Sequence, residues 1–343
     1  MVSSALLYII RRVINAFITI ILLLALVFAL VHLVLNTPLK LAKIYITTPR
    51  ATTAQLQAIA HQFGLDRPVW QQFVSYITGV FQGNFGFDTL YHEPEMKVLQ
   101  LYLPITIELV ITGTIIGVLI GVYTGAIAAA NRNRTADYGV KAVYLTTWST
   151  PTFLVCFILA LVFAYWLRLL PPHDVYSIGV PVPKPITGMP VIDGIITAHW
   201  AYAYSAAQHL ILPALSIGIG SFGLVTRLTR ASMIDALDRD YVKLAYMKGL
   251  SKGKVVWGTA FRNAIIPIIT LVALAFGLSV GGAVIAEVVF LYHGMGFFTF
   301  NAITNFDYNA ILGFTLITGI AVVLANLVAD FLYAWADPRV RLT

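Results

Sequence analysis

Charged residues are scarce in this chain and cysteine is almost absent. Asp, Glu, Lys and Arg make up 11% of the 343 residues, against about 25% in ordinary soluble domains. The single cysteine, Cys156, excludes a disulfide framework, a Cys/His zinc site and a dithiol redox pair. Because it lies in an apolar run, we expect Cys156 to be a packing residue, and we expect no metal site.

Apolar residues take the place of the missing charge. They form 59% of the chain, and the mean hydropathy is +0.84. A soluble fold has no place for so much apolar surface, so we expect an integral membrane protein whose solvent is the lipid bilayer. The net charge of +7 is therefore interpreted as an orientation signal, and no nucleic-acid partner is expected.

Six apolar segments reach the length of about 20 residues that a helix needs to cross a bilayer. The predicted fold is therefore all-α, with six transmembrane helices at residues 11–35, 104–130, 139–167, 209–227, 264–290 and 309–335. The first segment is too long for the apolar core of a signal peptide and has no cleavage site. We expect it to stay in the protein as a membrane helix.

The positions of Lys and Arg orient these helices. With the N-terminus in the cytoplasm, most cations fall on the cytoplasmic side, in the shorter loops, as in other membrane proteins. We therefore expect both termini in the cytoplasm and a sizeable external segment between the first two helices. The chain divides into an N-terminal helix (1–35), the external segment (36–103) and a five-helix core (104–343) with a charged cytoplasmic loop at 228–263.

The second apolar segment carries a regular series of glycines. They recur every four residues, at Gly113, Gly117, Gly121 and Gly125. This spacing places them on one face of a helix, where a second backbone can approach closely. We expect tight helix packing there; a groove that lines a substrate path is the alternative.

Three carboxylates lie inside the predicted spans, where an unpaired charge is costly. Glu108 and Glu287 lie near the outer ends of the second and fifth spans, and Asp330 lies near the inner end of the sixth. All three are close to a membrane surface. Two interpretations therefore stay open: structural pairing or contact with water, and a role in gating or translocation.

The loop at 228–263 is predicted to form a helix, a corner and a second short helix. Helical spacing predicts one apolar face, formed by Met233, Leu237, Tyr241 and Leu244. Gly249 can take the left-handed conformation that ends a helix, just after the cation Lys248. Ser251 then offers an N-cap for the second helix. Such a basic corner could lie on anionic lipid or dock on a soluble partner, and its tyrosines and sharp turn favour docking.

This loop resembles the EAA motif of the permease subunits of ATP-binding-cassette (ABC) importers, specifically the oligopeptide/dipeptide family. That motif reads Asp-Tyr-Val, an Ala, Lys-Gly-Leu-Ser, then Arg-Asn and a Pro. The matching residues are Asp240, Tyr241, Val242, Ala245, Lys248, Gly249, Leu250, Ser251, Arg262, Asn263 and Pro267. The chain departs from the motif at its Glu and first Ala, which are replaced by Lys243 and Leu244.

The resemblance covers nearly the whole chain. Further similar stretches are FGLDRPVWQQFVSYITGVFQGNFG (63–86), LPITIEL (103–109), STPTF (149–153), AEVVFLYHGMG (286–296) and NLVADFLYAWADPR (326–339). The resemblance implies a permease subunit in the cell membrane of a prokaryote, with no catalytic residues and no cofactor. The motif residues would couple it to an ATPase.

The implied partners are a second homologous permease subunit, two ATPase subunits on the cytoplasmic side and an extracytoplasmic substrate-binding protein. In agreement with separate ATPase chains, the sequence has no G-x-x-x-x-G-K-[ST] phosphate loop. The implied cargo is di- or oligopeptides, with oligosaccharides or nickel as alternatives.

Two other functional classes are less well supported. An ion-coupled secondary transporter usually carries ionisable residues at the membrane midplane and inverted repeats, but here the charges avoid the midplane. A membrane hydrolase would need a nucleophile with a base in reach. Ser221 lies in the stretch GIGSFG, and a serine among glycines in a membrane helix is usually a packing residue.

Overall fold

The structure is a computed structural model that describes residues 2–43, 51–88, 91, 93–305 and 307–336. It is almost entirely helical, which confirms the predicted all-α class. In the described part of the chain, the β-structure is limited to one antiparallel pair of two-residue strands, β1 (Phe87–Asp88) and β2 (Glu93–Pro94).

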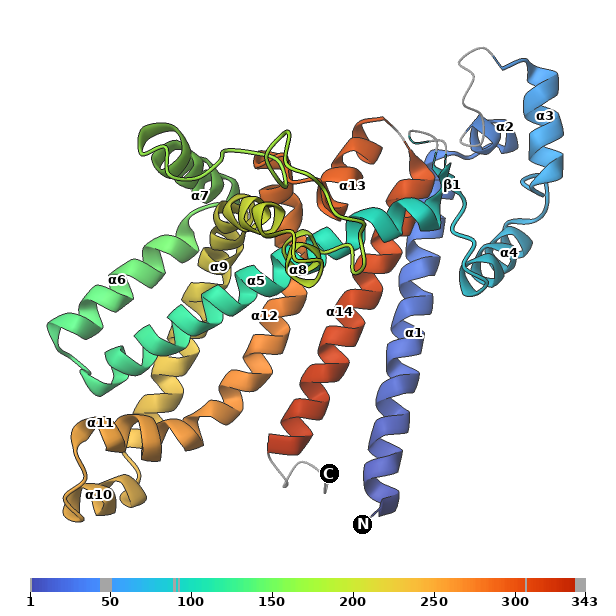
Figure 1. The fold of residues 1–343 in the computed structure, drawn as a ribbon. Coiled ribbons are helices and arrows are strands. Elements are labelled where there is room, and N and C mark those ends of the chain that lie inside the picture. The colour runs from blue at the N-terminus through green and yellow to red at the C-terminus, as the bar shows by residue number, and fades with distance from the viewer. Residues whose placement is uncertain (1, 44–50, 89–90, 92, 306, 337–343) are drawn as a thin grey trace.

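Long helices lie side by side and form the body of the protein (Figure 1). They are α1 (Val2–Val34), α5 (Glu95–Ala130), α9 (Trp200–Leu237), α12 (Phe261–Val289) and α14 (Tyr308–Ala336). Among the described residues, α5, α9 and the Ile10–Val34 part of α1 are long and apolar enough to cross a membrane. The protein is therefore an all-α membrane protein.

The predicted third span, residues 139–167, is not one straight helix. It consists of α6 (Thr135–Ser149), α7 (Thr152–Leu159) and the π-helical η2 (Ala160–Trp166), with a bend of 107° after α6. Pro151 explains the break, because a proline disfavours helical backbone at the preceding residue. Thr150 is accordingly extended, with φ −85° and ψ 126°. Counted as one span, this bent pair is the fourth segment able to cross a membrane.

α1, α5 and α9 extend well beyond their predicted spans, and α1 begins at Val2 instead of residue 11. α5 begins at Glu95 instead of residue 104 and continues through Pro104. α9 begins at Trp200 and ends at Leu237, whereas its apolar run covers only residues 209–227. An apolar run predicts only the part of a helix that can lie in lipid. The helix itself can continue into polar surroundings, because its backbone groups are bonded within the helix.

The glycine series lies where α5 crosses α9, which confirms the expected packing role. All four glycines are buried. A Cβ added at Gly113 would lie 2.8 Å from the carbonyl oxygen of Ala214, and one added at Gly125 would lie 2.7 Å from that of Thr226. These distances are shorter than van der Waals contact, so the crossing requires residues without a side chain.

We expect Gly117→Ala to loosen this crossing. The new Cβ would overlap the Ser221 hydroxyl and lie 2.5 Å from the carbonyl oxygen of Gly218, which cannot move without shifting α9. Overpacking of this kind costs about 1–3 kcal/mol. Thermal unfolding of the purified complex measures the loss. Gly139→Ala on α6 is the control, because nothing lies within 4 Å of a Cβ added there; equal melting temperatures for the two variants would contradict the close crossing.

The external segment is folded and packs beside one end of α1 (Figure 1). It contains α2 (Pro38–Ala42), α3 (Thr53–Gln62) and α4 (Val69–Phe81). Buried apolar side chains of this segment join Val31 of α1 and Leu312 of α14 in one cluster; they are Leu41, Ala42, Leu56, Ala60 and Leu65. Two further short helices, α8 (Pro190–Ile196) and α13 (Met295–Thr304), lie toward the same end of the molecule.

Candidate coupling surface and buried carboxylates

The charged loop forms a corner at the other end of the molecule, on the side where α1 begins (Figure 1). α9 leads into α10 (Asp240–Met247), and a turn at Gly249 leads into α11 (Lys252–Lys254), the π-helical η3 (Val255–Ala260) and then α12. We call residues 240–254 the coupling ridge. Its helix–corner–helix form confirms the sequence prediction.

Gly249 sets the direction of the turn. Its φ is +75°, as predicted for the residue that ends the helix. The Gly249 N–H donates to the carbonyl of Tyr246 (2.9 Å), and the Leu250 N–H donates to the carbonyl of Ala245 (3.3 Å). This pair of bonds is a Schellman motif. A Cβ added at Gly249 would meet no atom within 4 Å, so the backbone conformation, and not space, calls for glycine.

Ser251 lies at the predicted N-cap position of α11, but its side chain makes no capping hydrogen bond. Its backbone carbonyl accepts the N–H of Val255 at 3.0 Å. The position is therefore confirmed, while the expected hydroxyl contact is wrong. Ser251 starts α11 through its extended backbone, with φ −61° and ψ 150°.

The predicted apolar face of the loop is also wrong. It assumed one helix from Met233 to Leu244, but α9 ends at Leu237 and extended backbone at Arg239 separates it from α10. The break changes which side of α10 faces inward. Val242 and Ala245 are buried, together with Met233 and residues of η3, whereas Tyr241 and Leu244 are exposed.

The outer side of the ridge carries both apolar and charged side chains. Large exposed side chains are Tyr241, Leu244, Tyr246, Met247 and Leu250, of which Met247 is 82% exposed. Asp240 and Lys243 form an exposed ion pair (2.8 Å), which lowers the pKa of Asp240 and raises that of Lys243. Lys248 is exposed beside them. A group of large exposed apolar side chains with charged ones among them is typical of a protein contact.

The ridge is attached to the connection between α5 and α6. Lys252 Nζ donates to the side-chain oxygen of Asn131 (3.1 Å), and Arg132 lies 3.5 Å from the carboxylate of Asp238. Trp257 of η3 stacks on Tyr123 of α5, with ring centroids 5.8 Å apart. The ridge end of the protein is therefore joined to α5 as well as to α9 and α12.

A buried ion pair beside this attachment escaped the sequence analysis. The carboxylate of Asp137, fully buried in α6, accepts from Arg230 Nε (2.6 Å) and from a second Arg230 nitrogen (2.8 Å). It also accepts the N–H of Asn133 (3.0 Å) and lies 3.1 Å from Lys141 Nζ. The sequence offered only the Asp–Lys spacing of four residues, because Arg230 is on another helix.

The remaining motif residues lie apart from the ridge. Arg262 and Asn263 are exposed at the start of α12, where the Asn263 side chain donates to the carbonyl of Thr259 (3.0 Å). Pro267 is inside α12 and is exposed. The structure thus brings together the motif residues from Asp240 to Ser251 and leaves these three on the neighbouring helix.

Glu287 holds the start of α13. It is fully buried, and its Oε2 accepts the N–H groups of Gly296 (2.6 Å) and Phe297 (3.0 Å) in the first turn of that helix. Its Oε1 accepts the hydroxyl of Thr106 (2.6 Å), whose oxygen in turn accepts the N–H of Met295 (2.7 Å). A carboxylate at a helix N-terminus satisfies free N–H groups and the helix dipole.

Glu108 holds α8 in the same way. Its Oε1 accepts the N–H groups of Val191 and Ile192, both at 3.1 Å. Within α8, Asp193 accepts the N–H groups of residues 186–188 and so orders the preceding turn. Burial acts to raise the pKa of Asp193, but these hydrogen bonds, led by those from Thr187, outweigh it and lower the pKa. Asp330 lies in α14, and its side chain is outside the described residues.

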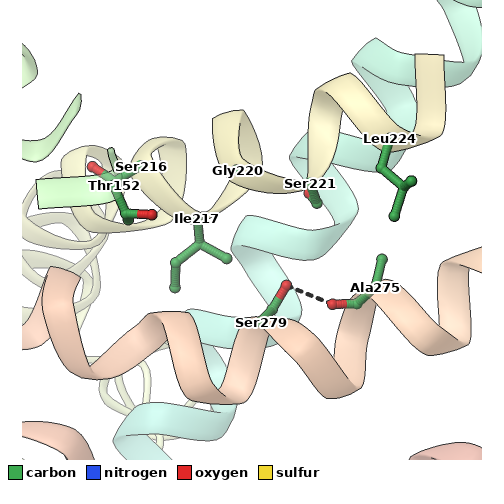
Figure 2. Close-up of a pocket in the computed structure, with 8 residues that line it drawn as sticks. All are labelled: Thr152, Ser216, Ile217, Gly220, Ser221, Leu224, Ala275 and Ser279. Atoms are coloured by element: carbon green, nitrogen blue, oxygen red, sulfur yellow. Dashed lines mark hydrogen bonds between the residues drawn. The ribbon is translucent and has the colours of Figure 1, made fainter. Parts of the chain in front are cut away.

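A cavity of about 180 Å³ lies between α7, α9 and α12. Its lining surface is mostly apolar although four of the lining residues carry a hydroxyl group, and Figure 2 shows Ile217 and Leu224 pointing from α9 toward Ala275 and Ser279 of α12. The Ser221 hydroxyl donates to the carbonyl of Gly218 (3.1 Å), and the Ser279 hydroxyl donates to that of Ala275 (2.8 Å). No His, Asp or Glu is among the described residues that line this cavity, so the packing interpretation of Ser221 is favoured.

Comparison with known proteins places this fold in a family. Residues 113–342 match the family described as "Binding-protein-dependent transport system inner membrane component", and residues 5–92 match "Binding-prot-dependent transport system membrane comp, N-term". The match over residues 113–342 contains α6 to α14, and the match over residues 5–92 contains most of α1 and all of α2 to α4.

Curated relatives match over most of their length. The chain is 34% identical to the probable D,D-dipeptide transport system permease protein DdpB of Escherichia coli, over 91% of each chain. It is 33% identical to the di/tripeptide transport system permease protein DppB of Pseudomonas aeruginosa, over 92% of this chain and 93% of the relative. It is 31% identical to the dipeptide transport system permease protein DppB of Alkalihalophilus pseudofirmus, with the same coverage. The chain therefore belongs to the family of inner membrane components of binding-protein-dependent transport systems.

Proposed function

We propose that this chain is a permease subunit of an ATP-driven ABC importer for di- or oligopeptides. The observation that carries the proposal is the match, over about nine-tenths of the chain, to permeases named for D,D-dipeptide, di/tripeptide and dipeptide transport. ATP hydrolysis belongs to partner chains, because the sequence lacks a phosphate-binding loop.

The proposed assembly contains a second permease subunit, two ATPase subunits and an extracytoplasmic binding protein. In this proposal α1, α5, the α6–α7 pair, α9, α12 and α14 cross the membrane six times, so both termini lie on one side. The excess of Lys and Arg on that side makes it the cytoplasm of a prokaryotic cell. In this topology the external segment would lie outside the cell, on the side of the binding protein. This topology puts the coupling ridge on the ATPase side.

The coupling ridge is the proposed contact with an ATPase subunit. Its outer side presents exposed apolar side chains, including Leu244 and Met247, while its inner side is fixed by the buried Val242 and Ala245. A rigid ridge seated in a groove follows the ATPase when ATP binding moves it. Because the ridge joins α9 to α12, this motion would tilt both helices and switch the side to which the path opens.

The gating role proposed for Glu108 and Glu287 acts through the helices that they hold. Each carboxylate fixes a short external helix, α8 or α13, to a long one. Tilting the long helices would carry these external helices along and change the outer mouth of the path. For Asp330 we propose a gating or translocation role as well, on the basis of its position in α14 alone.

Reconstitution tests the function. The chain is co-purified with its partner subunits, placed in proteoliposomes with its binding protein, and assayed for uptake of a labelled dipeptide. We expect uptake to require ATP and the binding protein, to survive ionophores, and to be competed by di- and tripeptides. Uptake that persists without ATP and collapses with an ionophore would establish a secondary transporter instead. Competition by oligosaccharides or nickel, but not by peptides, would overturn the cargo.

A further inference from the structure

The external segment contains a helix with no charge. From Pro68 to Phe87 the sequence has no Asp, Glu, Lys, Arg or His, although this stretch lies in a segment expected to face water. α4 forms from it, and none of the α4 residues is buried. An apolar helix left uncovered in this way requires a surface that accepts it.

α4 runs along α1 toward the N-terminus of α1. Near its start, the Gln72 side chain contacts His32 Nε2 (3.0 Å). One turn later, Tyr76 packs on Phe28, and at its end Phe81 stacks on Phe17, with ring centroids 6.0 Å apart. The partners on α1 thus move steadily away from its outer end as α4 proceeds. The two helices run in opposite directions.

The depth of the last contact places α4 at the level of the membrane. At about 1.5 Å per residue, Phe17 lies about 25 Å along the helix axis from Val34, the outer end of α1. The hydrocarbon layer of a bilayer is about 30 Å thick. Because Ile10–Val34 is a span long and apolar enough to cross a membrane, a helix end that touches Phe17 lies at the depth of the acyl chains.

The exposed side of α4 is mostly apolar, with Ser75 and Thr78 as its polar members, and it meets the exposed side of α1 at Phe17. Trp70, Val74 and Phe81 are 66%, 51% and 62% exposed, and their spacing puts them on one helix face. Phe17, which Phe81 contacts, is itself 51% exposed, and so is much of the α1 face around it, including Leu22 at 64%. The two faces form one apolar surface.

The polar groups at the two ends of this helix are bonded within the protein, as an environment without water demands. Gln72 donates to the carbonyls of Leu65 (3.0 Å) and Arg67 (2.8 Å). After the helix, the Gly83 N–H donates to the carbonyl of Val80 (3.0 Å) and the Asn84 N–H donates to that of Gly79 (2.8 Å). The turn therefore closes on the helix instead of depending on solvent.

We propose that α4 re-enters the bilayer from outside and lies within its hydrocarbon layer against α1, with Val74 and Phe81 facing lipid acyl chains. The occupant of this surface is lipid, because the face is uncharged and continuous with the lipid-facing side of a spanning helix. Trp70 lies nearest the preceding Asp66 and Arg67, where an indole suits the headgroup region. The proposal depends on the chain's being a membrane protein and not on its cargo.

Spin labels test the environment of this face. Val74→Cys and Phe81→Cys are made in a Cys156→Ala chain, labelled with a nitroxide, and placed with the full complex in lipid nanodiscs. Collisions with oxygen report lipid, and collisions with a water-soluble nickel chelate report water. Leu22→Cys on α1 is the lipid control, and Gln57→Cys on the exposed side of α3 is the water control.

We expect both α4 labels to behave like the label at Leu22, with oxygen access severalfold greater than chelate access. Labels that behave like Gln57→Cys would show a water-exposed helix and overturn the proposal. Immobilised labels reached by neither reagent would show that another protein covers the face, which would overturn it as well. All three outcomes are independent of whether the complex transports peptides.

Discussion

Gly249→Val is expected to abolish ATP-driven uptake while leaving the protein inserted and assembled in the membrane. The φ of +75° at this position belongs to the left-handed region, which costs an ordinary residue about 1–2 kcal/mol and a β-branched one more. The chain relieves this strain by giving up the Schellman turn. α10 then leaves the direction that its exposed side needs to dock, so ATP hydrolysis no longer reaches the membrane helices.

Uptake and ATPase activity of the reconstituted complex, measured together, separate uncoupling from misfolding. Gly258→Val is the matched control: it adds the same side chain in η3, outside the coupling ridge, where a new Cβ also meets no atom within 4 Å and φ is not positive. We expect near-normal transport from that variant. Transport by Gly249→Val at the rate of Gly258→Val would remove the coupling ridge from the mechanism.

Asp137→Ala is expected to destabilise the ridge end of the protein by about 3–5 kcal/mol, the usual cost of removing one partner of a buried ion pair. Arg230, whose side chain is only 18% exposed, would lose both carboxylate bonds and stay largely shielded from water. Thermal unfolding of the purified complex measures the loss. Uptake should fall too, because α6 and α9 would no longer be joined next to the ridge.

Two comparisons make this prediction specific. In Asp137→Ala with Arg230→Met, the charge left behind is removed as well, so the double variant should be more stable than the sum of the single losses predicts. Asp240→Ala removes an exposed carboxylate that also pairs with a lysine, and exposed pairs contribute little. If Asp137→Ala and Asp240→Ala lowered the melting temperature equally, the buried pair would not hold the helices together.

The ridge, the apolar cluster beneath it and the glycine crossing are in continuous contact. The inner side of the ridge packs Val242 and Ala245 into the same apolar cluster as Met233 of α9 and Ala126 of α5. Above that cluster, α5 and α9 are locked together by the glycine crossing. If the ridge moves as proposed, its displacement would be passed to the α5–α9 pair as a unit, because a close-packed interface transmits movement instead of absorbing it.

The sequence by itself determined the features that depend on residues close together in the chain. Apolar run lengths identified the long helices, the spacing of four identified the glycine face, and Gly249 marked the corner, because each signal lies within a few helical turns. The EAA-like stretch identified the family for the same reason. The breaks at Pro151 and at Arg239 were missed, since composition averaged over a segment hides a local bend.

Only the tertiary structure decided what depends on distant partners. The carboxylates of Glu108 and Glu287 turned out to cap α8 and α13, and Asp137 found Arg230 on another helix. α4 came to lie along α1 instead of standing free in the external segment. The physical reason is common to all of these: a buried polar group must be satisfied and an apolar face must be covered, but the sequence around them does not show which distant element does so.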